Sequence, residues 1–181
     1  KEEVYHSLIP EEIVKELALS KAKNVADDLL EKQEQVKQIS FDKKNNVLLD
    51  TIVIGADTIV VSDGSILGKP KDEADAVRMI RSLQGRSHKV YTGVAILDYD
   101  DEGKRKSVVH AVETEVFVNP MSDEEIREYA ATGEPLDKAG AYGIQGQFAA
   151  YIERIDGDYY NVVGLPVSYV YRQLKEIAEK D

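Results

Sequence analysis

The sequence predicts an α/β (α+β) fold in which a mixed twisted sheet is flanked by helices. Three observations favour this class. Apolar residues recur at helical spacing in several segments, β-branched runs of strand length lie between them, and turn-forming residues join neighbouring runs into hairpins. Helices interleaved with paired strands indicate a sheet covered by helices rather than a doubly wound parallel sheet.

Composition limits the classes of function. The chain has 181 residues, 43% hydrophobic and 31% charged, which is typical of one globular domain over residues 1–181. Its net charge of −11 argues against a basic surface, so we expect neither nucleic acid nor a membrane as a partner. No apolar run reaches the ~20 residues of a membrane span. The absence of cysteine excludes disulfides and thiolate metal sites and suits the cytoplasmic location that we expect.

The first helix is expected over residues 10–30. Pro10 is tolerated in a first helical turn, and Lys21 lies beside the apolar stripe, where a solvated surface lysine is the commoner role. The polar residues 31–46 are expected to be a frayed helix end followed by an exposed loop. The apolar stripe itself consists of Val14, Leu17, Ala18, Ala22, Val25, Ala26 and Leu29.

Residues 52–61 are expected to form a buried strand, because seven of them are apolar and most of those are β-branched. Asp57 lies near the middle of this run, and a buried carboxylate is costly unless a cation or hydrogen-bond donors replace its water. Asp57 is therefore either a structural residue held by backbone N–H groups or a cleft residue that meets a metal ion, a lysine or a reacting water. A turn at 62–65 and a return strand at 66–68 would bring Lys69 back toward this strand, which favours the cleft.

A second helix and two long strands are expected next. Asp72 is the expected N-cap of the helix, and Gly85 is its expected stop. The strand at 89–98 is apolar on both faces and should be central, whereas acidic residues alternate with apolar ones in the strand at 107–118.

The last third of the chain begins with a short helix. Ser122 and Glu125 form its capping box, and the helix should stop near Gly133. Residues 134–146 contain three glycines in seven positions, which indicates a loop that approaches something closely. We then expect a hairpin of two strands, 148–155 and 159–163. A terminal helix from Pro166 should bury Val167, Val170, Tyr171, Leu174 and Ile177.

Carboxylate and lysine chemistry is what the candidate residues offer. There is no P-loop, dinucleotide fingerprint or nucleophile elbow, and the three histidines do not have metal-ligand spacing. Carboxylates suit Mg²⁺, and lysines suit phosphate. The residues by themselves indicate a metal-assisted phosphate hydrolase. Its candidate residues are Asp57, Lys69 and Lys21, with Thr58 and Gln145 as neutral hydrogen-bonding groups.

Six short motifs, taken together in order and spacing, resemble the Maf family over essentially the whole chain. This family consists of nucleoside triphosphate pyrophosphatases related in fold to the inosine-triphosphatase group. The motifs are Ile54-Gly55-Ala56-Asp57-Thr58, Leu67-Gly68-Lys69-Pro70, Gly85-Arg86-Ser87-His88, Leu136-Asp137-Lys138-Ala139-Gly140-Ala141-Tyr142-Gly143-Ile144-Gln145-Gly146, Ile155-Asp156-Gly157-Asp158-Tyr159 and Val163-Gly164-Leu165-Pro166.

The resemblance implies hydrolysis between the α and β phosphates, with Mg²⁺ or Mn²⁺ as the cofactor. Asp57 matches the family's acidic residue that activates water or holds the metal. Lys21 and Lys69 match its phosphate-binding lysines, and Thr58 and Gln145 match the branch that prefers dTTP and UTP.

Arg86 and His88 also match family positions, with a structural and a functional role both open. The resemblance allows a homodimer. The family is also linked to inhibition of septum formation, so a non-catalytic regulator that acts through a binding partner is the alternative function. An enzyme of the purine-directed inosine-triphosphatase type is disfavoured by Thr58 and Gln145 in their motifs.

Two segments depart from the family. The strand and Ser-x-Ser-Pro-Arg-Arg loop with which the family opens have no counterpart here, so we expect one strand of the sheet and two arginines of the site to be missing. Near this departure Glu2 matches a metal-binding glutamate, so the metal is expected at Asp57 and Glu2. The segment 31–50 is longer than usual and is expected to be a surface insertion.

Overall fold

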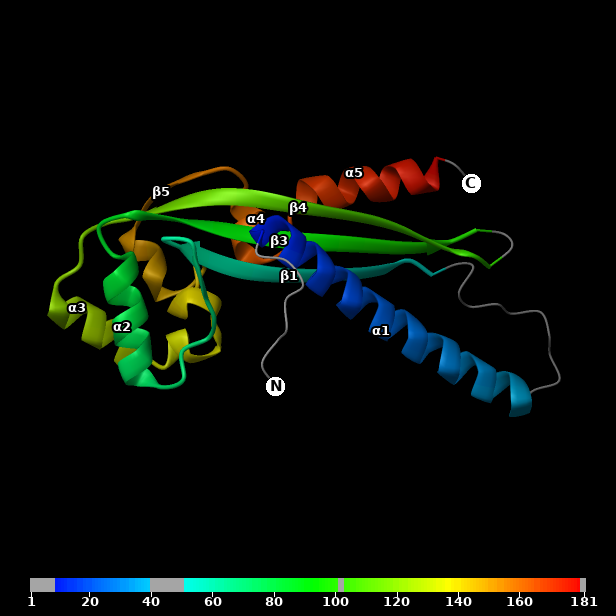
Figure 1. The fold of residues 1–181 in the computed structure, drawn as a ribbon, viewed down its shortest axis with the longest axis horizontal. Coiled ribbons are helices and arrows are strands. Elements are labelled where there is room, and N and C mark those ends of the chain that lie inside the picture. Colours follow the sequence, from blue (N-terminus) through cyan, green and yellow to red (C-terminus); the bar gives the residue numbers. More distant parts are fainter. Residues whose placement is uncertain (1–8, 40–50, 101–102, 180–181) are drawn as a thin grey trace.

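The computed structural model describes residues 9–39, 51–100 and 103–179. Figure 1 shows a long twisted sheet with helix α1 along one face and helix α5 along the other, while α2 and α3 form a small lobe at one end. The expected α/β class with a sheet flanked by helices is confirmed, but the described strands pair only antiparallel and do not form the expected mixed sheet. Glu2 and residues 40–50 of the expected insertion lie outside the described residues.

The sheet has five strands in the order β2-β1-β3-β4-β5, and every pairing between these described strands is antiparallel. The strand that the sequence predicts as central is indeed the middle one, because it is apolar on both faces. The strands are β1 (Val53–Ser62), β2 (Ser65–Leu67), β3 (Ser87–Tyr99), β4 (Arg105–Val118) and β5 (Ile152–Asp156).

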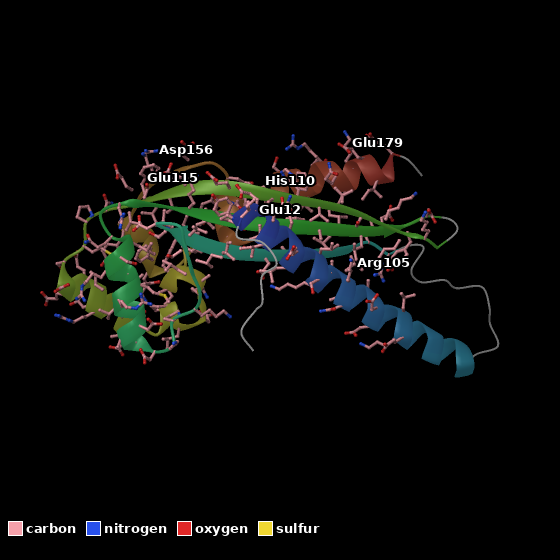
Figure 2. The ribbon with its side chains drawn as sticks, in the orientation of Figure 1. Glu12, Arg105, His110, Glu115, Asp156 and Glu179 are labelled. Atoms are coloured by element: carbon pink, nitrogen blue, oxygen red, sulfur yellow. The ribbon has the colours of Figure 1, made fainter. Side chains whose placement is uncertain are left out.

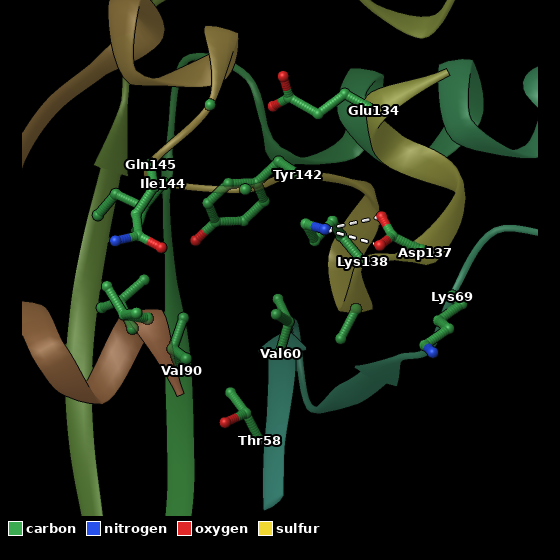
Figure 3. A pocket seen from close by; sticks show the side chains of 15 residues that line it. Thr58, Val60, Lys69, Val90, Glu134, Asp137, Lys138, Tyr142, Ile144 and Gln145 are labelled. Carbon is green, nitrogen blue, oxygen red and sulfur yellow. Dashed lines mark hydrogen bonds and ion pairs between the residues drawn. The ribbon is translucent and has the colours of Figure 1, made fainter. Parts of the chain in front are cut away.

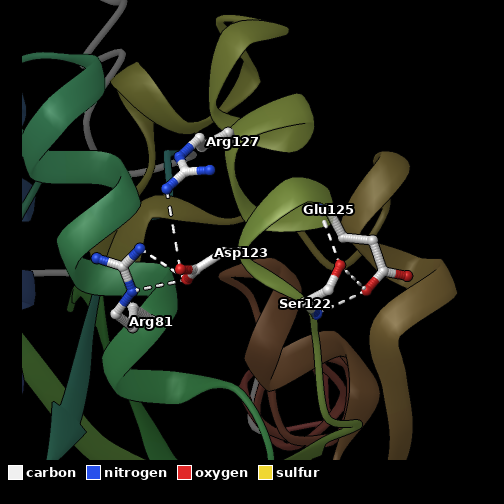
Figure 4. Close-up of polar contacts among 5 residues, drawn as sticks. All are labelled: Arg81, Ser122, Asp123, Glu125 and Arg127. Carbon is white, nitrogen blue, oxygen red and sulfur yellow. Dashed lines mark hydrogen bonds and ion pairs between the residues drawn. The ribbon is translucent and has the colours of Figure 1, made fainter.

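The helix caps confirm the predicted helix starts. The Asp72 side chain accepts a hydrogen bond from the Asp75 N–H at 2.8 Å, and Ser122 and Glu125 form the capping box seen in Figure 4. The helices are α1 (Pro10–Ile39), α2 (Glu73–Leu83), α3 (Asp123–Ala131), α4 (Tyr159–Val163) and α5 (Val167–Ala178), with 3-10 turns η1 (Glu134–Asp137), η2 (Ala139–Ala141) and η3 (Gln147–Tyr151).

Small residues let α1 lie directly against the sheet. Ala18, Ala22 and Ala26 are fully buried on the helix. A Cβ atom on Gly55 would collide with the carbonyl oxygen of Ala18, and a Cβ atom on Gly93 would collide with the Val14 peptide. The backbone of α1 is therefore held at a fixed, short distance from β1 and β3.

Polar and aromatic contacts attach α1 and α5 to β4 farther along the sheet (Figure 2). Arg105, at the start of β4, forms an ion pair with Asp27 of α1. His110 of β4 stacks on Tyr169 of α5 with ring centroids 4.3 Å apart. The two long helices thus stay on opposite faces of the same strands.

The face opposite α1 is covered in two parts. At the lobe end, Val60 and Val90 belong to a core that includes α2, α3 and Phe148. At the other end, Val94 and Val170 belong to the core beneath α5. Helix α4 lies between these two cores and buries Asn161 against β3 and β4.

The predicted hairpin of 148–155 with 159–163 is wrong. Residues 159–163 form α4, and β5 pairs with β4 instead. Local signals explain the helix: Asp158 caps it by accepting from the Tyr160 N–H at 2.8 Å, and Gly164 ends it with a φ of 117°. These caps outweigh the β-branched and aromatic residues between them.

The predicted apolar stripes are partly wrong. Helix α1 does not fray at residue 30 but continues to Ile39. Its Val25 and Leu29 are 51% and 37% exposed, and Val167 and Tyr171 of α5 are 44% and 67% exposed. Helical spacing indicates which side of a helix is apolar, whereas the partner that covers each residue depends on the tertiary packing.

Candidate active site

A cavity of about 540 Å³ opens on the sheet face opposite α1, between the lobe and α4. Figure 3 shows Val60 and Val90 side by side on its floor, with Tyr142, Lys138 and Asp137 across from them. Its volume lies within the range usual for small-molecule sites, roughly 300–1,000 Å³. The full lining is Thr58, Val60, Lys69, Val90, Glu134, Asp137, Lys138, Ala139, Tyr142, Gly143, Ile144, Gln145, Gly146, Val162 and Val163.

Glu134 fixes the glycine-rich segment that carries Gln145. One of its carboxylate oxygens accepts from the Tyr129 hydroxyl at 3.0 Å, and the other accepts from the Gln147 N–H at 3.0 Å. Gly146 has no room for a Cβ atom, which would collide with this carboxylate. The glycine is needed for close approach, as the sequence predicts, and the approach is to Glu134.

Two lysines line the cavity. Lys69 follows β2 and lies at the outer rim, whereas Lys138 is held by both carboxylate oxygens of Asp137, each 2.8 Å from its ammonium nitrogen (Figure 3). The hydrogen bond from Lys138 lowers the pKa of Asp137, and the charge of Lys69 lowers it further. Sequence reasoning missed Lys138 as a site residue, although its position in the glycine-rich segment was a usable signal.

His88 contacts Tyr142, a residue of the cavity lining. Its Nε2 atom lies 2.7 Å from the hydroxyl of Tyr142, and the two rings meet edge to face. Burial lowers the pKa of His88 to about 4 and raises the pKa of Tyr142. Arg86 forms a two-fold ion pair with Asp63 in the β1–β2 turn, at 2.9 and 2.8 Å. These contacts give both residues a structural part.

Asp57 and Lys21 meet on the other face of the sheet. The ammonium group of Lys21 contacts a carboxylate oxygen of Asp57, whose side chain is 17% exposed. A cation therefore replaces the water that Asp57 loses, as in the second interpretation, but Asp57 does not line the cavity, so the cleft part of that interpretation stays a prediction. The ammonium group that contacts Asp57 is that of Lys21 on α1 rather than that of Lys69, which was the expected cation.

Asp57 and Thr58 are neighbours at an edge of the sheet. Strand β2 pairs only with Val60–Ser62, so no described strand covers the outer edge of β1 from residue 53 to 59. Successive side chains of a strand point to opposite faces. Asp57 accordingly faces α1, whereas Thr58 faces the cavity.

Comparison with known proteins shows the family to which this chain belongs. A family model described as Maf-like protein matches residues 1–177. The chain belongs to the Maf-like family. A relative from Agathobacter rectalis named dTTP/UTP pyrophosphatase is 43% identical over 97% of this chain and 83% of its own length. Relatives of the same name from Clostridium beijerinckii and Carboxydothermus hydrogenoformans are 47% and 44% identical, over 91% and 97% of this chain and 76% and 82% of their own.

The Maf-like residues that the sequence singled out fall into two groups in this structure. Thr58, Lys69 and Gln145 line the cavity, whereas Asp57 and Lys21 pair on the α1 side of β1. The two groups adjoin through the backbone of β1 at its open edge. Among the described residues no helix has the length and apolarity needed to cross a membrane.

The Mg²⁺ or Mn²⁺ that the Maf-like resemblance implies can be tested against the donors that the structure offers. Within residues 9–39, 51–100 and 103–179 no three His, Cys, Asp or Glu residues gather as a metal cage. Mg²⁺ is usually held by one or two carboxylates together with substrate phosphates. Asp57, a carboxylate at an open edge, fits such a shared site.

Proposed function

We propose that this Maf-like protein is a nucleoside triphosphate pyrophosphatase that hydrolyses dTTP and UTP to the monophosphate and pyrophosphate. The names of its relatives support this activity. The observation that carries the proposal is one continuous edge of β1, with a lysine-lined cavity on one side and the Asp57–Lys21 pair on the other.

The substrate would extend around this edge. The nucleoside occupies the cavity, which is apolar at Val60 and Val90 and polar at Thr58 and Gln145. The triphosphate follows the edge of β1 toward Lys69 and Lys21, whose ammonium groups neutralise its charge. Lys138, which lines the cavity together with Lys69, adds a third cation.

The reaction is the attack of water on the α phosphorus, which breaks its bond to the oxygen bridging the α and β phosphates. Asp57 accepts the proton of that water, and pyrophosphate leaves with the bridging oxygen. Lys21 and Lys69 stabilise the negative charge that builds up on the phosphate oxygens. Asp57 and Glu2 would hold Mg²⁺ or Mn²⁺, which supplies further charge neutralisation when bound.

A panel of triphosphates tests the proposal. Purified protein is mixed with Mg²⁺ or Mn²⁺ and with dTTP, UTP, dCTP, dATP, dGTP, 7-methyl-GTP or ITP, and pyrophosphate release is measured. We expect release from dTTP and UTP. In water labelled with heavy oxygen, the label should enter the monophosphate, because the water attacks the α phosphorus.

Two outcomes would contradict the proposal. Release from purine triphosphates alone would favour a purine-directed enzyme. Absence of release from every nucleotide, together with a division defect on overexpression, would favour the non-catalytic regulator of septum formation. The cytoplasmic location and the homodimer stay predictions.

A further inference from the structure

A row of three oxygen atoms runs from the cavity wall into the protein. The Thr58 hydroxyl oxygen lies 2.8 Å from the hydroxyl oxygen of Thr92, and that oxygen lies 2.7 Å from the backbone carbonyl oxygen of Asn161. Figure 3 shows Thr58 on β1 with its hydroxyl directed toward β3, the strand that carries Val90. Thr92 and Asn161 are fully buried.

These distances fix the direction of both hydrogen bonds. Two oxygens this close require a hydrogen between them, and the row contains two such contacts. The carbonyl of Asn161 has no hydrogen, so Thr92 must donate its own to Asn161. Thr92 then has none left for Thr58, and Thr58 must donate to Thr92. Thr58 therefore offers lone pairs to the cavity and no hydrogen.

The carbonyl that sets this direction is itself immobilised. Asn161 donates from its side-chain amide to the Val90 carbonyl at 3.1 Å and to the Thr114 hydroxyl at 2.9 Å. The Gly164 N–H also donates to the Asn161 carbonyl, at 3.0 Å. Helix α4 is thereby fixed to β3 and β4. If Thr92 donated to Thr58 instead, lone pairs of the Thr92 hydroxyl and the Asn161 carbonyl would face each other at 2.7 Å.

We propose that Thr58 acts only as a hydrogen-bond acceptor toward the substrate, and that Thr92 is the positioning residue that makes it so. The inference rests on the proposed function. Phosphate oxygens are acceptors and cannot bond to such a group. Thr58 therefore recognises a hydrogen-bond donor on the nucleoside half of the nucleotide.

Two donors are common to dTTP and UTP. Thymine and uracil both carry an imide N3–H, whereas N3 of cytosine is an acceptor. The 3′-hydroxyl of the sugar is the other shared donor. A site built to bond a donor rejects the analogue that lacks it, because its own polar group is left without a partner.

Substrate analogues identify the donor. We would measure kcat/KM for dTTP, N3-methyl-dTTP and 3′-deoxy-dTTP with the wild type and with Thr58→Val. We expect Thr58→Val to lower kcat/KM for dTTP about fivefold, the value of one hydrogen bond of about 1 kcal/mol. For one of the two analogues, Thr58→Val should leave kcat/KM unchanged. That analogue is the one that lacks the group from which Thr58 accepts a hydrogen bond. An equal loss with all three substrates would overturn the assignment.

Thr92 is tested through its effect on Thr58. Thr92→Val should reduce the preference for dTTP over that analogue, and Thr92→Ser, which keeps a hydroxyl, should restore it. In the Thr58→Val background Thr92→Val should not alter the preference further. The positioning role would be overturned if Thr92→Val left the preference for dTTP unchanged. It would also be overturned if the effects of Thr58→Val and Thr92→Val on that preference multiplied in the double variant.

Separate control measurements distinguish a variant that fails to fold from one that has lost substrate recognition. Thermal unfolding of each variant shows whether it is folded, and if Thr92→Val is not, Thr92→Ser and the analogues with Thr58→Val still test the acceptor. A wild type that hydrolyses none of the triphosphates refutes the proposed function itself. A wild type that hydrolyses dTTP but lacks the pattern above refutes only this inference.

Discussion

The ammonium group of Lys21 contacts the carboxylate of Asp57 across 36 positions of sequence, from the middle of α1 to the middle of β1. Asp57 is largely buried, and this pair compensates the water that its carboxylate has lost. The geometry depends on the short distance between α1 and the sheet at Gly55 and Gly93. The packing of α1 on the sheet therefore also determines the position of Lys21 relative to Asp57.

Asp57→Asn should abolish turnover while the fold stays intact. The amide keeps the shape of the side chain but cannot accept the proton of water, so we expect kcat to fall by at least about 100-fold. Steady-state kinetics with dTTP and far-UV circular dichroism measure the two effects. Asp123→Asn is the matched control, because Asp123 is also ion-paired, to Arg81 and Arg127, but lies on the surface (Figure 4).

Lys21→Ala should lower kcat/KM for dTTP by roughly 100-fold, the size of effect seen when one stabilising donor is removed from a transition state. Lys23→Ala removes an exposed lysine from the same helix, two residues away, and should retain the wild-type rate. Equal rates for Lys21→Ala and Lys23→Ala would exclude Lys21 from the site.

Lys69→Ala should weaken substrate binding, because the rim of the cavity loses a cation that faces the triphosphate. We expect KM to rise by about tenfold or more and the dependence of KM on salt to become shallower. Lys104→Ala, an exposed lysine before β4, is the control for loss of charge alone. A KM that stays at the wild-type value in Lys69→Ala would place the triphosphate elsewhere.

Gly93→Ala should destabilise the protein, because its Cβ atom would collide with the backbone of α1 at Val14. We expect a loss of about 3 kcal/mol in the free energy of unfolding, measured by denaturant titration. Gly68→Ala, where a Cβ atom meets nothing within 4 Å, should change it by less than about 0.5 kcal/mol. Similar losses in both variants would mean that α1 does not approach the sheet this closely.

His88 should make stability depend on pH. Burial lowers its pKa from 6.5 to about 4, so between these values the unfolded chain takes up a proton that the folded protein does not. The stabilisation is complete above pH 6.5 and is lost as pH falls toward 4, by on the order of 3 kcal/mol.

Unfolding titrations at neutral and acid pH measure this contribution. His88→Phe should lose less stability on acidification than the wild type, because it has no imidazole to protonate when unfolded. Tyr142→Phe keeps His88 buried and should retain the wild-type dependence, since burial rather than the tyrosine hydroxyl lowers the pKa. Parallel curves for wild type and His88→Phe would contradict the assignment.

Elements with strong local signals were predicted correctly. The Asp72 cap and the Ser122–Glu125 capping box each satisfy backbone N–H groups within one turn, so a few neighbouring residues determine them. Helix α4 was missed because Tyr159, Tyr160 and two valines favour a strand, while its caps lie outside the five residues. Short elements depend on their ends more than on their propensities.

The candidate site was predicted as a set of residues, not as an arrangement. Spacing and motif resemblance single out Asp57 and Thr58 together, but only the alternation of β1 separates them onto two faces. The partnership of Asp57 with Lys21 joins residues 36 positions apart, and no local pattern predicts it. Lys138 and the Thr92–Asn161 contact were likewise found only in the structure.

The sequence by itself determined the fold class, the central strand, most helix starts and the chemistry available at Asp57 and the lysines. These follow from periodicity, capping and side-chain type, which act over a few residues. The tertiary structure decided which lysine meets Asp57, where α1 can touch the sheet, and which way the hydrogen of Thr58 points. Those relationships depend on atoms brought together from distant segments, and sequence spacing does not specify such distances.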